Sequence, residues 1–478
     1  MYHYVGFPTV KLMPFVFYDT ETTGTSRHYD QILQFAAIRT DDDLNEIDRF
    51  ELRCRLLPHI IPTAGALLVT GMSLDCLLDP KLPSHHDFIL QCHARLTAWS
   101  PATFVGYNTL RFDEPLLRQA FYQSLKPVYL TNTNGNSRQD ILPLIRAANS
   151  LAPGSFAIPR NEDGKPAFKL DRLAPANGFK DHEAHDALGD VLATIHLAKL
   201  IKDRSPDVWR RSLEFCSRSG VERFVEANDC FFLVDTMRND GGGYVVAPVG
   251  TPRHRDRQVI CLSLDTDLAA LEAMDDDELG KWSRRSPRPI RRFRTNTAPH
   301  LLSLNEVPSH LWGEMTARKA RARARRYLEN TALQRRIGAL VADAEPEYDT
   351  PTNVEEQIYE GFYSTADVRL MDRFHDAHWH ERWEITRQFE DKRLQQLARR
   401  LIFTESPESL PSASRASMAR KMAARMLGEG KTGDWTCIPT AMKELRERWR
   451  DADEQQRALL KPLRVYLRER KRWAKSVT

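Results

Sequence analysis

Over roughly the first 200 residues, short apolar runs alternate with longer stretches in which apolar residues recur every three or four positions. Strand-like runs occupy 15–21, 31–41 and 49–57 and are separated by polar turns. Helix-like stretches follow at 86–99 and 113–125. Strands that succeed one another through short turns and then alternate with helices predict an α/β sheet with mixed strand directions.

The pattern changes twice further along the chain. After a helix expected at 185–201 and a connector at 202–207, short β-rich pieces between Gly, Pro and charged turns predict a small β-rich domain. Glycines 241–243 indicate a hairpin turn, because the Gly-Lys-Ser/Thr of a phosphate loop does not follow. A second linker is expected at 345–353, before an almost wholly helix-like region. We therefore expect three domains, at 1–204, 205–350 and 351–478.

Composition agrees with a globular protein of several domains. The 478 residues suit about three domains, and 41% hydrophobic with 28% charged residues lies near globular averages. No apolar stretch approaches the ~18 residues of a membrane span, and the N-terminus lacks the features of a secretory signal. The seven cysteines form no CxxC pair, which indicates reduced thiols. We expect a cytoplasmic protein with no membrane partner.

Charge is unevenly distributed, although the formal net charge is only +4. Residues 281–338 contain fifteen Lys or Arg, three Glu and no Asp. Such a stretch can bind a polyanion, and the alternative is a solvated basic helix face. Trp282, Phe293 and Tyr327 are interleaved with the basic residues, and the charge pattern taken alone leaves both possibilities open.

Candidate chemistry begins at Asp19 and Glu21, which lie two positions apart at the end of the first apolar run. Side chains at i and i+2 of a strand share one face, roughly 6.6 Å apart, so both carboxylates can reach one metal site. Their mutual repulsion raises the pKa of at least one of them unless a cation compensates. The alternative is a strand that ends in a polar turn with both acids facing solvent.

Further acidic positions occur later in the chain. Asp113 begins an expected helix after a short apolar piece, where an ordinary N-cap is the alternative. Asp186 and Asp190 lie i to i+4, on one face of the helix expected at 185–201. His185 can converge with Asp190 only from the turn before the helix, and its pKa suits proton transfer near neutrality. A capping acid beside a solvent-facing histidine is the alternative.

Together these residues resemble the ordered motifs of the DEDDh 3′ to 5′ exonucleases: DTET at 19–22, Asp113 after GYNTLRF, and H-D-A-x-x-D from His185 to Asp190. Further segments resemble the bacterial exonuclease I family over nearly the whole chain. The resemblance implies a ribonuclease H-like α/β domain with a mixed sheet, a small β-rich SH3-like domain with a basic helix, and a C-terminal all-α domain. These would close around a groove for single-stranded DNA. In that context we favour the basic stretch 281–338, with Trp282, Phe293 and Tyr327, as part of a groove that binds the strand by stacking. The further segments are 34–41, 65–71, 136–140, 176–179 and 344–364.

The implied activity is removal of 5′-mononucleotides from the 3′ end of single-stranded DNA, in DNA repair and recombination. The implied cofactors are two Mg²⁺ ions, for which Mn²⁺ can substitute; such ions can activate the water and stabilise the leaving oxygen. Asp19 would bridge the ions, with Glu21 and Asp190 on the nucleophile side. Asp113 would assist the other ion, and His185 would be the general base.

Substrate contacts are expected where charged or apolar side chains match the family's groove, and each has a structural role as its alternative. Lys169 stands where the family commonly has an arginine near the terminal phosphates, and lysine loses the bidentate fork. Arg118, Arg138 and Arg146 are candidate phosphate contacts, and Leu67 is a candidate partner of the terminal base. The expected substrate contacts are Glu21, Leu67, Arg118, Arg138, Arg146 and Lys169.

The resemblance also implies a monomer and a basic pocket for the acidic, Phe-ended C-terminal tail of single-stranded DNA-binding protein, which we place near Arg335 and Arg336. One alternative is an exonuclease acting on RNA or short oligonucleotides, since the 2′-hydroxyl is read outside the active-site motifs. Another is a non-catalytic tether for single-stranded DNA. The long chain beyond the first domain favours a long strand, and the complete set of four carboxylates and a histidine favours catalysis.

Overall fold

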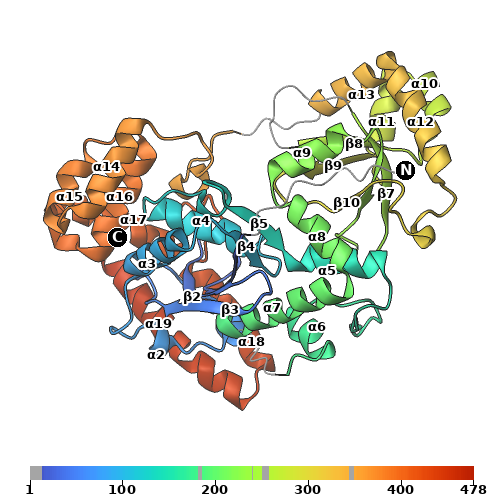
Figure 1. The fold of residues 1–478 in the computed structure, drawn as a ribbon. Coiled ribbons are helices and arrows are strands. Elements are labelled where there is room, and N and C mark those ends of the chain that lie inside the picture. Colours follow the sequence, from blue (N-terminus) through green and yellow to red (C-terminus); the bar gives the residue numbers. More distant parts are fainter. Residues whose placement is uncertain (1–12, 181–185, 239–240, 250–257, 344–348, 478) are drawn as a thin grey trace.

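The computed structural model shows a first part built on a mixed sheet, flanked on opposite sides by a second sheet with its own helices and by the C-terminal helices (Figure 1). Among the described residues, no helix is both long and apolar enough to cross a membrane. Each of the seven cysteines lies in the described part of the chain and is free, as predicted. The structure describes residues 13–180, 186–238, 241–249, 258–343 and 349–477.

The first sheet has the strand order β3-β2-β1-β4-β5. The strands β1 (Phe15–Thr22), β2 (Ile32–Thr40) and β3 (Glu46–Arg53) pair antiparallel. By contrast, β4 (Thr103–Gly106) pairs parallel with β1, and β5 (Ser137–Asp140) pairs parallel with β4. The mixed strand directions predicted from the sequence are therefore confirmed.

Helices cover both faces of this sheet. One core contains α3 (His85–Ala98) and α4 (Asp113–Gln123), and the other contains α5 (Ile141–Leu151), α6 (Leu170–Ala176) and α7 (Ala187–Arg204). Because successive strand residues point to opposite faces, the odd-numbered apolar residues of β1 join the α5–α7 core and the even-numbered ones join the α3–α4 core. Odd-numbered positions of β1 therefore face α7.

The second part begins with two helices, α8 (Pro206–Glu214) and α9 (Arg218–Glu226), where we expected β-rich structure. Pro206 in the first turn and the Ser217 N-cap start them, and buried Trp209 anchors the first. The sheet that follows is antiparallel throughout, in the order β10-β6-β7-β8-β9. Its strands are β6 (Phe231–Val234), β7 (Gly243–Pro248), β8 (Gln258–Ser263), β9 (Ile290–Arg294) and β10 (Leu301–Leu302).

The predicted hairpin at 241–243 is confirmed, because β6 and β7 pair antiparallel on either side of it. Gly241 and Gly242 have φ of +81° and +103°, a backbone region that glycine enters without steric cost. The turn thus uses the backbone freedom of its glycines.

The basic stretch 281–338 folds differently from the predicted stacking surface. Trp282 and Tyr327 are buried in the core beneath the helices of this part, and Phe293 packs against Phe231 with ring centroids 6.3 Å apart. The stacking role predicted for Trp282 and Tyr327 is therefore wrong, since a base cannot reach a buried ring. The helices are α10 (Leu268–Ala273), α11 (Asp276–Ser283), α12 (Ala317–Glu329) and α13 (Thr331–Asp343).

The C-terminal part is helical, as predicted. Its last two helices pack against α1 (Ala64–Thr70) and α2 (Leu74–Leu77) of the first part, which join them in one apolar core. Short 3₁₀ turns η1 (Leu130–Asn132) and η3 (Val354–Gln357) lie beside α4 and before the first C-terminal helix. The helices are α14 (Thr365–Asp376), α15 (Trp379–Thr386), α16 (Lys392–Glu405), α17 (Ser412–Leu427), α18 (Ile438–Asp451) and α19 (Glu454–Val477).

Candidate active site

The end of β1 presents two carboxylates to the start of α7. Asp19 and Glu21 occupy odd-numbered positions, so they lie on the face that α7 covers. Asp190 lies in the first turn of α7. Carboxylate oxygens from the three residues all lie within 4.8 Å of one another. The structure therefore brings three of the five predicted active-site residues into one cluster that can hold a metal ion.

Asp113 borders this cluster from the start of α4, the helix that follows strand β4. It is the first residue of α4 and is buried, and its Oδ1 accepts a 2.6 Å hydrogen bond from the Thr20 hydroxyl. Thr20 lies between the two acids of β1, and the charge of Asp113 adds to burial in raising the pKa of both of them. The fourth predicted carboxylate therefore contributes to the same electrostatic site.

A residue that we did not predict, Asp140, holds the turn that leads to Asp113. It is buried at the N-cap of α5, where its carboxylate accepts hydrogen bonds from the backbone N–H groups of Asn108 and Leu110 at 2.8 and 3.1 Å. Burial raises its pKa to about 6. An acid that ends a strand and caps a helix was the available sequence signal.

The cluster carries more negative charge than its surroundings neutralise. Burial, and then the charges of Asp113, Asp190 and Glu21, raise the pKa of Asp19 well above its ordinary value. Burial is also the first cause that raises the pKa of Glu21 to about 8 and that of Asp113 to about 7. Arg53 opposes this shift at Glu21. Closely spaced, partly buried carboxylates whose charge is only partly neutralised fit hard divalent cations.

The start of α7 differs from the prediction. The helix begins at Ala187, and Asp186 is its N-cap rather than a residue on the same helical face as Asp190. Its carboxylate accepts hydrogen bonds from Gln34 and Arg53, both at 2.9 Å, which fix the entry to the helix. The predicted general base, His185, lies outside the described residues.

Two of the predicted phosphate contacts are bound to a buried carboxylate instead. Arg118 and Arg138 donate to Glu114 at 2.7 and 3.0 Å, and the hydroxyls of Tyr18 and Thr131 donate to the same carboxylate. Although burial opposes it, these partners hold the pKa of Glu114 below its ordinary value. The structure therefore gives both arginines a structural role, and a phosphate contact by either stays a prediction.

Substitution of Arg138 by methionine is expected to destabilise the protein by about 3 kcal/mol, because it leaves a buried charge short of one partner. The guanidinium of Arg138 is itself buried, so solvent screens the pair weakly. Urea denaturation measures the loss. The control is Arg160→Met, an exposed arginine. A loss no larger than that of the control would contradict this role.

The other predicted substrate contacts lie in three different settings. Leu67 is 1% exposed and packs in the core shared with α18 and α19, which argues against contact with a base. Lys169 is exposed at the start of α6. Arg146 lies over the Phe168 ring at 5.2 Å and donates to the Thr236 carbonyl at 3.0 Å. Its guanidinium therefore bridges the first and second parts.

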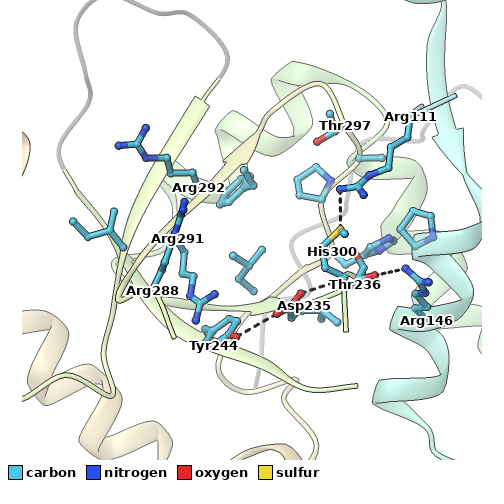
Figure 2. Close-up of a pocket in the computed structure, with 18 of the residues that line it drawn as sticks. Arg111, Arg146, Asp235, Thr236, Tyr244, Arg288, Arg291, Arg292, Thr297 and His300 are labelled. Carbon is cyan, nitrogen blue, oxygen red and sulfur yellow. Dashed lines mark hydrogen bonds between the residues drawn. The ribbon is translucent and has the colours of Figure 1, made fainter. Parts of the chain in front are cut away.

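A cleft of about 1310 Å³ lies between these two parts (Figure 2). Arg111 and Arg146 reach it from the first part, and several basic residues around β9 line it from the other side. Arg291 lies 3.4 Å over the Tyr244 ring, a cation–π contact. Part of the basic stretch thus faces a concave surface with apolar patches. Arg335 is exposed on α13, and Arg336 pairs with Asp276 at 2.7 Å.

The mixed sheet and its acidic cluster define a metal-dependent exonuclease, and residues 16–198 match the family model described as "Exonuclease". Residues 352–470 match the model described as "Exonuclease I C-terminal domain". Exodeoxyribonuclease I of Escherichia coli K12 is 30% identical over 374 residues, which cover 75% of this chain and 78% of the relative. The chain belongs to the exodeoxyribonuclease I family.

Further comparisons agree with this assignment. Exodeoxyribonuclease I of Haemophilus influenzae is 31% identical over 412 residues, or 81% of this chain and 85% of the relative. The crystal structure of E. coli Exonuclease I in complex with a dA16 oligonucleotide superposes with a TM-score of 0.84 at 27% identity, covering 96% of this chain and 100% of that one. A structure of SSB/Exonuclease I in complex with the inhibitor CFAM gives a TM-score of 0.80 with the same coverage and identity.

Proposed function

We propose that this protein removes 5′-mononucleotides from the 3′ end of single-stranded DNA, in DNA repair and recombination. The convergence of Asp19, Glu21 and Asp190, bordered by Asp113, carries the proposal, because it provides hard ligands for catalytic metal ions. The E. coli relative bound to dA16 supports a single-stranded DNA substrate.

We assign two Mg²⁺ ions to this site, with Mn²⁺ as a substitute. Asp19 would contact both ions, Glu21 and Asp190 would hold the nucleophile-side ion, and Asp113 would hold the other. Bound ions would activate the attacking water and stabilise the leaving 3′ oxygen. His185 would take the proton from the water.

Other residues of the chain maintain this arrangement. The Thr20 hydroxyl fixes the carboxylate of Asp113, so Asp113 stays oriented beside the strand that carries Asp19 and Glu21. Gln34 and Arg53 hold Asp186 at the start of α7, the helix that carries Asp190. These hydrogen bonds keep the carboxylates of separate elements at one site before a substrate arrives.

We also propose that the cleft of Figure 2 binds the acidic, Phe-ended C-terminal tail of single-stranded DNA-binding protein. Guanidinium groups such as those of Arg111 and Arg146 suit carboxylates, and apolar lining residues such as Leu142 and Pro143 suit an aromatic ring. Arg336 pairs with Asp276, which lines this cleft, so the cleft lies beside the position first expected. We further propose that the protein acts as a monomer, because the site is built within one chain. The free thiols fit the reducing cytoplasm.

Arg146→Ala is expected to weaken binding of a synthetic acidic peptide ending in Phe by about tenfold or more, because a charge-assisted contact is lost. Fluorescence anisotropy of the labelled peptide measures this effect. Arg160→Ala, which removes an exposed arginine outside the cleft, should bind as wild type does. Equal peptide affinities of wild type and Arg146→Ala would argue against the cleft as the tail site.

The activity is tested with 5′-labelled single-stranded DNA, matched duplex and matched RNA, each incubated with Mg²⁺ or EDTA and resolved on a gel. The proposal expects Mg²⁺-dependent shortening of the single strand from its 3′ end by wild type and no shortening by Asp19→Ala. Binding without shortening would instead favour a tether. Degradation of RNA alone would keep the chemistry and change the substrate.

A further inference from the structure

Two aromatic side chains are unusually exposed in the segment between η3 and α14. The Phe362 side chain is 86% exposed and that of Tyr359 is 56% exposed. Gly361, between them, has a φ of +105°, which a residue with a side chain rarely adopts. One exposed apolar side chain needs no explanation, but several aromatic rings gathered at one place on the surface indicate a contact with another molecule.

The exposure is not that of a loose loop. On one side of the segment, Gln119 and Tyr122 of α4 donate to the carbonyl oxygens of Glu355 and Val354 at 3.0 and 2.8 Å. Arg393 of α16 donates to the Gly361 carbonyl at 3.2 Å. The backbone of η3 is therefore tied to the first part, and the backbone between the two rings is tied to the C-terminal helices, so the segment has a defined position.

A third ring and a guanidinium complete the group. Tyr129, next to η1 in the first part, has its ring centroid 6.2 Å from that of Phe362. The Arg118 guanidinium lies over the Tyr129 ring at 5.2 Å, and Tyr359 interacts with the same guanidinium. We call Tyr129, Tyr359 and Phe362 the aromatic platform. Arg118 links its members across the boundary between two parts of the molecule.

The aromatic platform is connected to the active site through α4. Arg118 pairs with Glu114, the residue after Asp113. Arg118 lies five residues beyond Asp113, about 7.5 Å along the helix axis at 1.5 Å per residue. A strand with one phosphate per ~3.4 Å spans such a distance within a few nucleotides. A strand whose 3′ end lies at the cluster can therefore reach the platform.

We propose that the aromatic platform stacks on a base of the single-stranded DNA, a few nucleotides upstream of the bond that is cut. This inference rests on the proposed function. Exposed rings beside a guanidinium have the composition that binds bases of any sequence, because every base presents a π-face. The platform replaces the buried Trp282 and Tyr327 as the place where bases stack.

The test is Phe362→Ala, with binding of 5′-fluorescein-dT12 measured by anisotropy in EDTA, where cleavage cannot occur. The affinity should fall by about five- to a hundred-and-fiftyfold, the range of one lost base stack. The slope of log affinity against log salt concentration should stay unchanged, because no phosphate contact is removed. Phe362→Trp should restore binding, and its indole fluorescence should change when dT12 is added.

Two controls separate the platform from other effects. Val465→Ala, at an apolar residue 52% exposed on α19, should bind dT12 as wild type does. Hydrolysis of a dinucleotide by Phe362→Ala should stay at the wild-type rate, because one nucleotide spacing of ~3.4 Å does not reach the platform. If wild type shortens single-stranded DNA and Phe362→Ala binds dT12 within twofold of it, the platform is overturned while the proposed function stands. If wild type never cleaves DNA, the proposed function fails, whereas the anisotropy result still decides whether the platform binds DNA.

Discussion

Asp19→Asn is expected to reduce cleavage of single-stranded DNA by about a thousandfold or more and yet to raise the stability of the metal-free protein. A carboxylate oxygen of Asp19 lies within 4.8 Å of carboxylate oxygens of Glu21 and Asp190. Burial together with neighbouring charges destabilises the ionised form of Asp19. Removing that charge relieves repulsion in the absence of a cation. With a cation, the same substitution removes a ligand and several kcal/mol of transition-state stabilisation.

The two effects are measured separately. Thermal unfolding of wild type should shift upward with Mg²⁺ or Mn²⁺, by the equivalent of about 2.7 kcal/mol at one hundred times the dissociation constant. The Asp19→Asn variant should begin more stable in EDTA and gain little from either ion. Asp163→Asn, which removes an exposed carboxylate elsewhere, should behave as wild type does in both assays. A full metal-induced shift in Asp19→Asn would contradict the assignment of Asp19 as a ligand.

Glu355→Gln is expected to lower the free energy of unfolding by about 3 kcal/mol at neutral pH. The buried carboxylate of Glu355 pairs with Arg400 of α16 at 2.7 Å and with Arg425 of α17. The backbone carbonyls of Glu355 and Val354 accept hydrogen bonds from α4, so the same segment joins the C-terminal helices to the first part. A neutral glutamine leaves two partly buried arginines without their counter-charge.

The stability that Glu355 contributes depends on pH. The two arginines lower the pKa of Glu355 from 4.5 to about 2, although burial opposes the shift. A carboxyl whose pKa is lower in the folded state than in the unfolded chain contributes its full stability at pH values above the pKa of the unfolded chain. That contribution is lost as the pH falls towards the pKa of the folded state. The difference between wild type and Glu355→Gln should therefore be full above about pH 5 and shrink towards pH 2. Urea denaturation across this range measures it.

The matched control is Glu360→Gln, an exposed glutamate five residues away. It should change stability by less than about 0.5 kcal/mol at every pH, as surface substitutions usually do. If Glu355→Gln proves as stable as this control, or if its loss of unfolding free energy stays constant down to pH 2, the Glu355 carboxylate does not stabilise the contact between the C-terminal helices and the first part.

Features that depend on neighbouring residues were predictable from the sequence. The apolar run that forms β1, the shared face of Asp19 and Glu21, the glycine hairpin and the basic helix α12 all follow from the local backbone period and from residue preferences. The order and spacing of the acidic motifs indicated the family without any coordinates. These signals suffice because each one is set within a few residues of the chain.

Features that depend on which distant segments meet became clear only in the fold. Packing of α7 on the sheet brings Asp190 to Glu21, and Glu114 binds the arginines that we had assigned to phosphates. The sequence pattern alone also favoured the wrong rings for stacking. Trp282 is buried and Phe362 exposed because burial is decided by the elements packed around a side chain, and those elements come from distant parts of the chain.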